Sequence, residues 1–361
     1  MPVRILHIVT YMGRGGLETL LMNCFRTIDR DQIQFDFLVH RDFRADYDDE
    51  IEALGGRIYR IPRLNPVNPG YFRALYTFFK SHPEYRIVHC HLDCMSALPL
   101  SVAKKCGVPV RIAHSHNASQ DKNWKYFLKR FYMKKIPDSA THFFACSSDA
   151  ASWMFPGQQA TIINNGISVD AFRYQPDVRD HIRSELSLSD CFVVGHTGRF
   201  APQKNHNFLI DVFSHIHSKN PKSILMLIGT GDLEPQIRKK VASLNLQDSV
   251  LFLGSQSNVS GYLQAMDAYV MPSIYEGLGI AAVEAQASGL PCFLSDTIPA
   301  ECKMTENVYY LSLNLPAEQW ADAILEIDPN TRTSGHGAVR NAGFDISMTS
   351  EYLQSFYLEN W

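Results

Sequence analysis

Short runs of apolar, β-branched and aromatic residues alternate with longer amphipathic segments along most of the chain. Runs of this kind are typical of strands buried on both faces of a parallel sheet, and the segments between them are long enough for helices. The first series of predicted strands comprises residues 4–10, 35–39, 57–61, 86–89, 110–114, 142–146 and 161–163.

The alternation breaks once and then restarts. A charged stretch after Asn164-Asn165-Gly166 runs to about residue 190, and we expect it to be irregular. The second series of predicted strands comprises residues 192–197, 224–228, 250–253, 268–271, 292–294 and 308–311. Two such series predict an α/β protein with two Rossmann-like, doubly wound parallel-sheet domains that face each other across a cleft. The domains are expected at residues 1–170 and 171–345, and a last helix at 346–361 either closes the second domain or crosses back to the first.

Composition narrows the class of protein. Of the 361 residues, 45% are hydrophobic and 20% are charged, which argues against disorder. The net charge of -3 provides no overall attraction for nucleic acid. The eight cysteines form no Cys-x-x-Cys pair and the N-terminal residues lack a signal-peptide pattern, so we expect a cytoplasmic protein. No apolar segment reaches the roughly 20 residues that a membrane span requires.

The segment from Tyr275 to Pro291 is the most informative stretch of the chain. It places Glu276 on a glycine-rich loop after a predicted strand and Glu284 inside the alanine-rich helix that follows. Free N–H groups at a helix start attract anions, and a nearby carboxylate accepts hydrogen bonds from hydroxyls. The segment therefore predicts a site for a phosphate and a polyol together, as in a nucleotide sugar.

A second glycine-rich loop follows the first predicted strand. Gly15 and Gly16 would let a ligand approach the backbone closely, although a tight turn without a ligand is an alternative. Glu18 replaces the third glycine of the dinucleotide fingerprint, which disfavours NAD. Residues 13–18 have the form G-x-G-x-x-E, and Gly229 begins a second stretch of this form in the second half of the chain.

Two cations follow the first strand of the second series. Arg199 and Lys204 lie on a loop at the carboxyl end of this strand, where open α/β sheets place their ligands. Arg199 could clamp a diphosphate with its planar fork and Lys204 with a point charge. Their position disfavours the alternative, which is that both are ordinary surface charges.

Histidines occur in pairs where two predicted strands end. His89 and His91, and likewise His114 and His116, are spaced so that both members share one face of the sheet. A zinc site is an alternative, but it is disfavoured because the chain has neither a Cys-x-x-Cys pair nor a helical His-x-x-x-His pair. We expect polar residues that line the cleft or bond to backbone groups, with His116 the best candidate for substrate contact. Asp29-Arg30-Asp31 and Asp46-Tyr47-Asp48 indicate a turn and a helix start rather than a metal site.

Residues 122–137 contain no acidic side chain and show helical spacing. One predicted face is apolar and its borders are cationic, a pattern that fits either a helix lying in an anionic membrane surface or a helix packed on its own domain core. The apolar face comprises Trp124, Phe127, Leu128 and Phe131, and the flanking cations include Lys122, Lys125, Lys129, Lys134 and Lys135.

Together these motifs resemble the retaining GT-B glycosyltransferases of glycosyltransferase family four. The resemblance covers residues 5–361 and rests on Gly15-Gly16-Leu17-Glu18, Asn165-Gly166-Ile167, Gly198-Arg199 with Lys204-Asn205, and the E-x7-E pair of Glu276 and Glu284. Residues 114–117 and 284–291 are most similar to bacterial exopolysaccharide and capsule biosynthesis glycosyltransferases. Many members carry a proline after the loop, where this chain has Gly279-Ile280.

The resemblance implies that the first domain binds the acceptor, that the second binds the donor and that the last helix crosses back to the first domain. It implies transfer of a hexose from a nucleoside-diphosphate sugar, with UDP expected, to a lipid-linked oligosaccharide, with retention and without a divalent metal or other cofactor. The residues it assigns to catalysis are His116, Arg199, Lys204 and Glu276; those it assigns to donor binding are Gly15, Gly16, Gly229, Gly254, Gly277, Leu278, Gly279 and Glu284; and it assigns none to a metal.

The expected partners are thus a nucleotide sugar, an oligosaccharide or lipid-linked acceptor, and an anionic membrane contacted through Lys122 to Lys135. This would place the protein at the inner face of the cell membrane. One alternative is a GT-B epimerase or hydrolase acting on the nucleotide sugar, but no additional base stands out for it. The other is a non-catalytic nucleotide-sugar-binding subunit, which is disfavoured because both cations and both glutamates are present.

Overall fold

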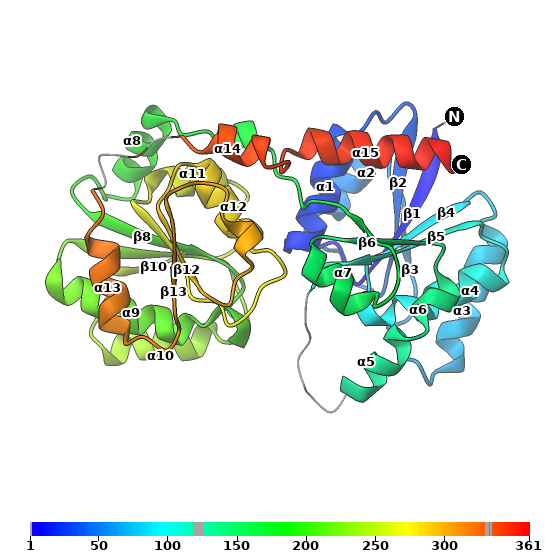
Figure 1. The fold of residues 1–361 in the computed structure, drawn as a ribbon, viewed down its shortest axis with the longest axis horizontal. Helices are drawn as coiled ribbons and strands as arrows, with labels where there is room; N and C mark the ends of the chain where they lie inside the picture. Colours follow the sequence, from blue (N-terminus) through cyan, green and yellow to red (C-terminus); the bar gives the residue numbers. More distant parts are fainter. Residues whose placement is uncertain (1, 118–125, 329–331, 333) are drawn as a thin grey trace. The chain divides into compact units, whose positions relative to one another are not determined.

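The computed structural model describes residues 2–117, 126–328, 332 and 334–361. The chain forms two compact units, one containing residues up to Ile167 together with Asp345–Trp361, and the other containing Ser168–Phe344. Each unit is built on a fully parallel sheet whose two faces are covered by helices (Figure 1). This confirms the predicted class of two Rossmann-like α/β folds.

The sheet of the first unit has seven strands in the order β3-β2-β1-β4-β5-β6-β7. The strands are β1 (Val3–Val9), β2 (Ile33–Val39), β3 (Ile58–Arg60), β4 (Ile87–Cys90), β5 (Val110–Ser115), β6 (His142–Ala145) and β7 (Thr161–Ile162). The helices are α1 (Gly16–Thr27), α2 (Asp48–Ala53), α3 (Pro69–Ser81), η1 (Asp93–Ser96), α4 (Ala97–Lys105), α5 (Tyr126–Met133), α6 (Ile136–Ser139), α7 (Ser148–Met154) and α15 (Ile346–Glu359).

Strand β1 shows how the sequence pattern produces two cores. Leu6 and Ile8 join the core that also contains α3 and α4, whereas Ile5 and Val9 join the core on the opposite face. Successive side chains of a strand point to opposite faces, so a run of apolar residues is buried on both. Strand β7 is an exception, because both of its residues are exposed although we expected a buried strand. It lies at the edge of the sheet and has only one strand neighbour.

The last helix completes the first unit. Helix α15 packs beside α1, and it contributes Leu353 and Tyr357 to the core that α1 covers (Figure 1). Its start is fixed by Asp345, whose side chain accepts a hydrogen bond from the backbone N–H of Ser347. The N–H of Ile346 also donates to the carbonyl of Ile167 over 2.9 Å.

The sheet of the second unit has the order β10-β9-β8-β11-β12-β13, and the strand order reverses between β8 and β11. The strands are β8 (Phe192–Thr197), β9 (Ser223–Ile228), β10 (Val250–Phe252), β11 (Ala268–Met271), β12 (Cys292–Ser295) and β13 (Val308–Leu311). The helices are η2 (Val169–Phe172), α8 (Pro176–Glu185), η3 (Pro202–Lys204), α9 (His206–Lys219), α10 (Glu234–Ser243), α11 (Val259–Ala265), α12 (Ile280–Ala287), η4 (Ala300–Cys302), α13 (Ala317–Leu325) and α14 (His336–Asn341).

Helix α8 corrects the expectation of an irregular stretch before residue 190. Pro176 stands at the start of this helix, where its missing N–H has no cost. Few of the helix's residues are apolar, so its pattern was hard to recognise. It is held mainly by polar contacts, since Arg179 and Arg183 both pair with Asp267.

The basic and aromatic segment also differs from its prediction. It forms two short helices, α5 and α6, and Lys122, Trp124 and Lys125 lie outside the described residues. Phe127 is 81% exposed and Phe131 is 55% exposed, whereas Met133 is buried. The alternative in which this apolar face packs on the domain core is therefore wrong for these two phenylalanines.

Among the described residues, no helix combines the length and the apolar character that crossing a bilayer would need.

Candidate active site

The loops that follow the central strands of the second unit lie side by side. The N–H of Gly229, after β9, donates to the carbonyl of Gly254, after β10, over 2.8 Å. The N–H of Ile274, after β11, donates to the carbonyl of Gln203 in η3, also over 2.8 Å. These loops carry most of the predicted site residues, and they gather at the carboxyl ends of the strands, where parallel sheets bind ligands.

Two predicted catalytic residues contact each other directly. The Lys204 ammonium lies 2.6 Å from Oε1 of Glu276, and the two side chains are only 17% and 8% exposed. Gln203 donates to the carbonyl of Tyr275 over 2.9 Å and lies 3.3 Å from Oε2 of Glu276. The sequence suggested two groups acting separately on a ligand. The structure instead shows a largely buried ion pair, so a bound diphosphate would compete with Glu276 for the ammonium.

Arg199 differs from Lys204 in its surroundings. It follows β8 directly and is exposed. Within the described part of the chain, its guanidinium forms no ion pair. Arg199 is therefore a cation beside the Lys204–Glu276 pair that is available to an anionic ligand.

Backbone packing explains two of the glycines in these loops. At Gly229, φ is +139°, and an added Cβ would lie 2.1 Å from the carbonyl oxygen of Gly198. At Gly231, φ is +159°, and an added Cβ would lie 2.6 Å from the carbonyl oxygen of Phe200. The loops after β8 and β9 approach so closely that no larger residue fits. Gly254 has φ +66° but open space around it.

The loop after β11 leads into α12 as predicted from the sequence. Gly279 is the N-cap of α12 with φ +89°, and no side chain caps the helix start. Its first N–H groups are therefore suited to an anion. Leu278 is buried, and Glu284 lies one turn into the helix. Burial raises the pKa of Glu284 to about 7, because it disfavours the charged carboxylate.

Sequence reasoning missed Gln286, which fixes α12. Its Nε2 donates to the carbonyl of Cys302 over 2.7 Å, and its Oε1 accepts from the N–H groups of Met304 and Thr305 over 2.8 and 3.1 Å. The side chain is fully buried. Apart from Glu284, Gln286 is the one polar side chain of α12, which was the available signal, but its partners became visible only in the fold.

In the first unit, the predicted histidine pairs belong to a larger cluster. We call it the histidine cluster, and its members, which come from β1, β4, β5 and the residues that follow β4 and β5, are His7, His89, His91, His114 and His116. The rings bond to one another rather than to backbone groups, which corrects that part of the expectation. Burial lowers the pKa of His7 and His116 to about 3, so both rings are neutral at pH 7.

Two hydrogen-bonded chains run through the histidine cluster. In one, the Tyr357 hydroxyl lies 2.7 Å from Nδ1 of His89, and Nε2 of His89 lies 3.0 Å from Nδ1 of His114. In the other, Nδ1 of His7 lies 3.1 Å from Nε2 of His91, and Nδ1 of His91 lies 2.9 Å from Nε2 of His116. Helix α15 thus contributes a side chain to a polar cluster in the sheet.

Asp93 holds the backbone at His116, a contact that could not be predicted from spacing along the chain. Its carboxylate accepts from the His116 N–H over 3.2 Å and from the Asn117 amide over 2.7 Å. Asp93 has φ +44°, a backbone conformation that residues other than glycine rarely adopt. Such conformations are often found at functional sites.

Gly15 and Gly16, also in the first unit, lie at the start of α1. Gly15 is the N-cap, and Gly16 is the first helical residue. An added Cβ on Gly15 would lie 2.3 Å from a carboxylate oxygen of Glu18, whereas Gly16 faces open space. The backbone of α1 is therefore accessible at Gly16.

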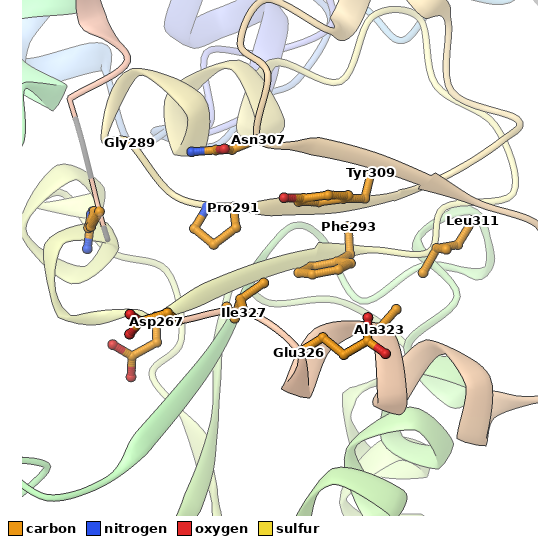
Figure 2. Close-up of a pocket in the computed structure, with 12 residues that line it drawn as sticks. Asp267, Gly289, Pro291, Phe293, Asn307, Tyr309, Leu311, Ala323, Glu326 and Ile327 are labelled. Atoms are coloured by element: carbon orange, nitrogen blue, oxygen red, sulfur yellow. The ribbon is translucent and has the colours of Figure 1, made fainter. Parts of the chain in front are cut away.

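A pocket of about 380 Å³ lies elsewhere in the second unit (Figure 2). It is lined by Pro291 and Asn307, which precede β12 and β13, and by α13. It contains none of the predicted site residues. Because it begins at the amino ends of the strands, it lies away from the edge where ligands of such sheets bind.

Comparisons with known proteins identify the family. The family model described as Glycosyltransferase Family 4 matches residues 14–171, and the model described as Glycosyl transferases group 1 matches residues 177–331. The chain is 36% identical to the putative glycosyltransferase EpsF of Bacillus subtilis (strain 168), across 89% of this chain and 86% of that protein. It is 26% identical to a UDP-Gal:alpha-D-GlcNAc-diphosphoundecaprenol alpha-1,3-galactosyltransferase of Escherichia coli, across 79% and 78%.

Solved structures agree in fold. The crystal structure of Anabaena HepE in complex with UDP-glucose superposes with a TM-score of 0.82 at 18% identity, across 99% of this chain and all of that one. The motifs, the two parallel sheets and the relatives lead to one conclusion: this chain belongs to glycosyltransferase family 4 and is a glycosyltransferase with the GT-B fold.

Proposed function

We propose that this protein transfers a hexose from a UDP-sugar to a lipid-linked oligosaccharide, with retention and without a divalent metal, in the biosynthesis of an exopolysaccharide or capsule. The observation that carries the proposal is the Lys204–Glu276 pair, with the exposed Arg199 on the same loop as Lys204. The relatives support it by name, since they include a capsular polysaccharide biosynthesis glycosyltransferase of Staphylococcus aureus and an enzyme whose acceptor is a diphosphoundecaprenol-linked sugar.

The proposed chemistry follows from the charges at the strand ends. As the bond from sugar to diphosphate breaks, negative charge grows on the leaving group while the sugar approaches an oxocarbenium ion. Arg199 and Lys204 would stabilise the leaving diphosphate, a task for which other enzymes use a metal ion. When Lys204 turns to the diphosphate, Glu276 is released to accept hydrogen bonds from the sugar hydroxyls. The N–H groups of Gly277 to Gly279 would bind the sugar beside it.

The remaining assignments are proposals of the same kind. Glu284 would accept hydrogen bonds from the ribose hydroxyls, and Gly229 and Gly254 would keep the donor loops close to the nucleotide. In the first unit, the N–H groups at Gly15 and Gly16 would bind the diphosphate, and His116 would contact the sugar near its reacting carbon.

The first test is a thermal-shift screen of the purified protein against UDP-, GDP- and ADP-sugars. A ligand that binds only the folded protein raises the melting temperature by mass action. We expect UDP-sugars alone to raise it. Product analysis with and without a lipid-diphosphate-linked acceptor then separates transfer from hydrolysis or epimerisation. Absence of any shift in the whole panel would contradict the proposal, and so would turnover that does not depend on the acceptor.

Donor affinity should depend on pH through Glu284. Its pKa is raised to about 7, so the carboxylate that would accept the ribose hydroxyls forms only as the pH rises through neutrality. We expect the Kd of UDP-glucose, whose diphosphate does not titrate in this range, to fall by up to about tenfold between pH 6 and pH 8. Calorimetric titration measures it. In Glu284→Gln the affinity should be weak and independent of pH, and an unchanged slope would refute the assignment.

Helix α5 has exposed aromatic side chains that would contact a membrane. Phe127 and Phe131 project into solvent, and Lys135 lies 5.8 Å from the Phe131 ring. Exposed aromatic side chains bordered by lysines favour insertion at an anionic lipid surface. A lipid-linked acceptor would place the enzyme at such a surface.

We expect Phe127→Ser/Phe131→Ser to lower binding to vesicles that contain phosphatidylglycerol by about tenfold, measured by co-sedimentation. Val67→Ser is the matched control, because Val67 is 82% exposed but lies outside α5. If the control lost as much binding as the double variant, contact through α5 would be refuted.

A further inference from the structure

Some ring nitrogens of the histidine cluster are buried without a hydrogen-bond partner. In the described part of the chain, Nε2 of His114 and Nδ1 of His116 are buried and have no hydrogen-bond partner. Leaving a polar atom buried without a hydrogen-bond partner is unfavourable. The two atoms lie on neighbouring rings, whose centroids are 4.1 Å apart.

The geometry points to a Zn²⁺ ion bound by His91, His114 and His116. Each of these three rings places one nitrogen within 4.8 Å of the nitrogens of the other two. In a tetrahedral site with Zn–N bonds of about 2.0–2.1 Å, ligand nitrogens are roughly 3.4 Å apart, so small ring rotations suffice. Three histidines leave the fourth position for water.

The other two histidines supply the outer contacts that such a site needs. A ligating histidine donates its second N–H to an acceptor, which fixes its tautomer. If His114 binds through Nε2, its Nδ1–H can donate to Nε2 of His89 at 3.0 Å, and His89 in turn can donate to the Tyr357 hydroxyl at 2.7 Å. If His91 binds through Nδ1, its Nε2–H can donate to Nδ1 of His7 at 3.1 Å. Both chains can thus adopt the proton arrangement that metal binding requires.

The three rings differ in burial. His91 and His114 are 4% and 2% exposed, but His116 is only partly buried and follows the end of β5. The bond between His91 and His116 would open when both turn to the ion. The site shares His116 with the proposed sugar contact, so its test measures metal binding and does not depend on activity.

The experiment uses the full chain after treatment with a chelator. Calorimetric titration with Zn²⁺ should give one ion per chain, and Co²⁺ should give the visible absorption of a tetrahedral complex. We expect His116→Ala to weaken Zn²⁺ binding by at least about 100-fold, and His89→Ala to weaken it by about 10–100-fold through the lost outer contact. His181→Ala is the matched control, because His181 is exposed in the second unit and should not affect binding.

Several results would overturn the proposal. One is the absence of stoichiometric binding by the wild-type chain, which would indicate that buried water satisfies the free nitrogens. Another is unchanged affinity in His116→Ala. Circular dichroism and the melting temperature of each metal-free variant establish that it is folded. His116 is the primary site for substitution because its partial exposure makes the change least disruptive.

Discussion

Replacing Lys204 by alanine is expected to lower turnover by about two to three powers of ten, as measured with saturating donor and acceptor. The ammonium is held at the strand ends by Glu276 at 2.6 Å, and both groups are largely shielded from water. Electrostatic stabilisation is strong in such surroundings, and the diphosphate would gain it as its charge grows. KM for the donor should change less than kcat, because the charge develops only as the bond breaks.

The substitution also leaves Glu276 buried without its partner, and that effect must be separated from the loss of the cation. Lys204→Ala/Glu276→Gln removes the uncompensated charge, so the melting temperature should recover while turnover stays low. Lys222→Ala, at an exposed position of the same unit, should leave turnover unchanged. Recovery of turnover in the double variant would show that Lys204 acts only as a structural partner.

Replacing Gly229 by alanine should destabilise the second unit by about 3 kcal/mol or more. The new Cβ would lie 2.1 Å from the Gly198 carbonyl oxygen at a φ of +139°, so both the loop conformation and its neighbour oppose it. For a domain of this size, the melting temperature should fall by about 6–12 °C, as measured by differential scanning calorimetry. Turnover should also fall, because the loop of Arg199 must move.

Gly337→Ala is the matched control for this prediction. Gly337 lies in α14, an added Cβ would have nothing within 4 Å, and its φ is not in the positive range. Alanine in a helix is favoured over glycine by about 0.5–1 kcal/mol, so this variant should melt at the same or a slightly higher temperature. Equal losses in both variants would mean that close packing of the loops is not what Gly229 provides.

Much of the fold could be predicted from the sequence because buried parallel strands leave a strong local signal. The central strands β1, β8 and β11 are mostly apolar, and each was expected within a residue or two of its observed bounds. Strand β7 was predicted at its observed position but wrongly as buried, and helix α8 was wrongly expected to be irregular, since neither buries a continuous apolar run. Their structure depends on contacts with residues far away in the sequence, which periodicity does not show.

The positions of the candidate residues could be predicted better than their contacts. Spacing and loop position placed Arg199, Lys204 and Glu276 at the strand ends, where parallel sheets bind ligands, and their role in binding stays a prediction. The pairing of Lys204 with Glu276 joins residues on separate loops, and only the sheet order brings those loops together. The hydrogen bonds of the histidine pairs to His7 and Tyr357 likewise join residues that are far apart in the sequence.

The discontinuity of the first unit has a consequence for synthesis on the ribosome. The second unit is one uninterrupted stretch, whereas the first needs residues from both ends of the chain. Its early strands emerge well before α15, so the face that Leu353 and Tyr357 will cover stays uncovered until residues 346–359 have been made. Domains generally fold in the order in which they are translated. Here that order is reversed at the last step, and the unit that is begun first is finished second.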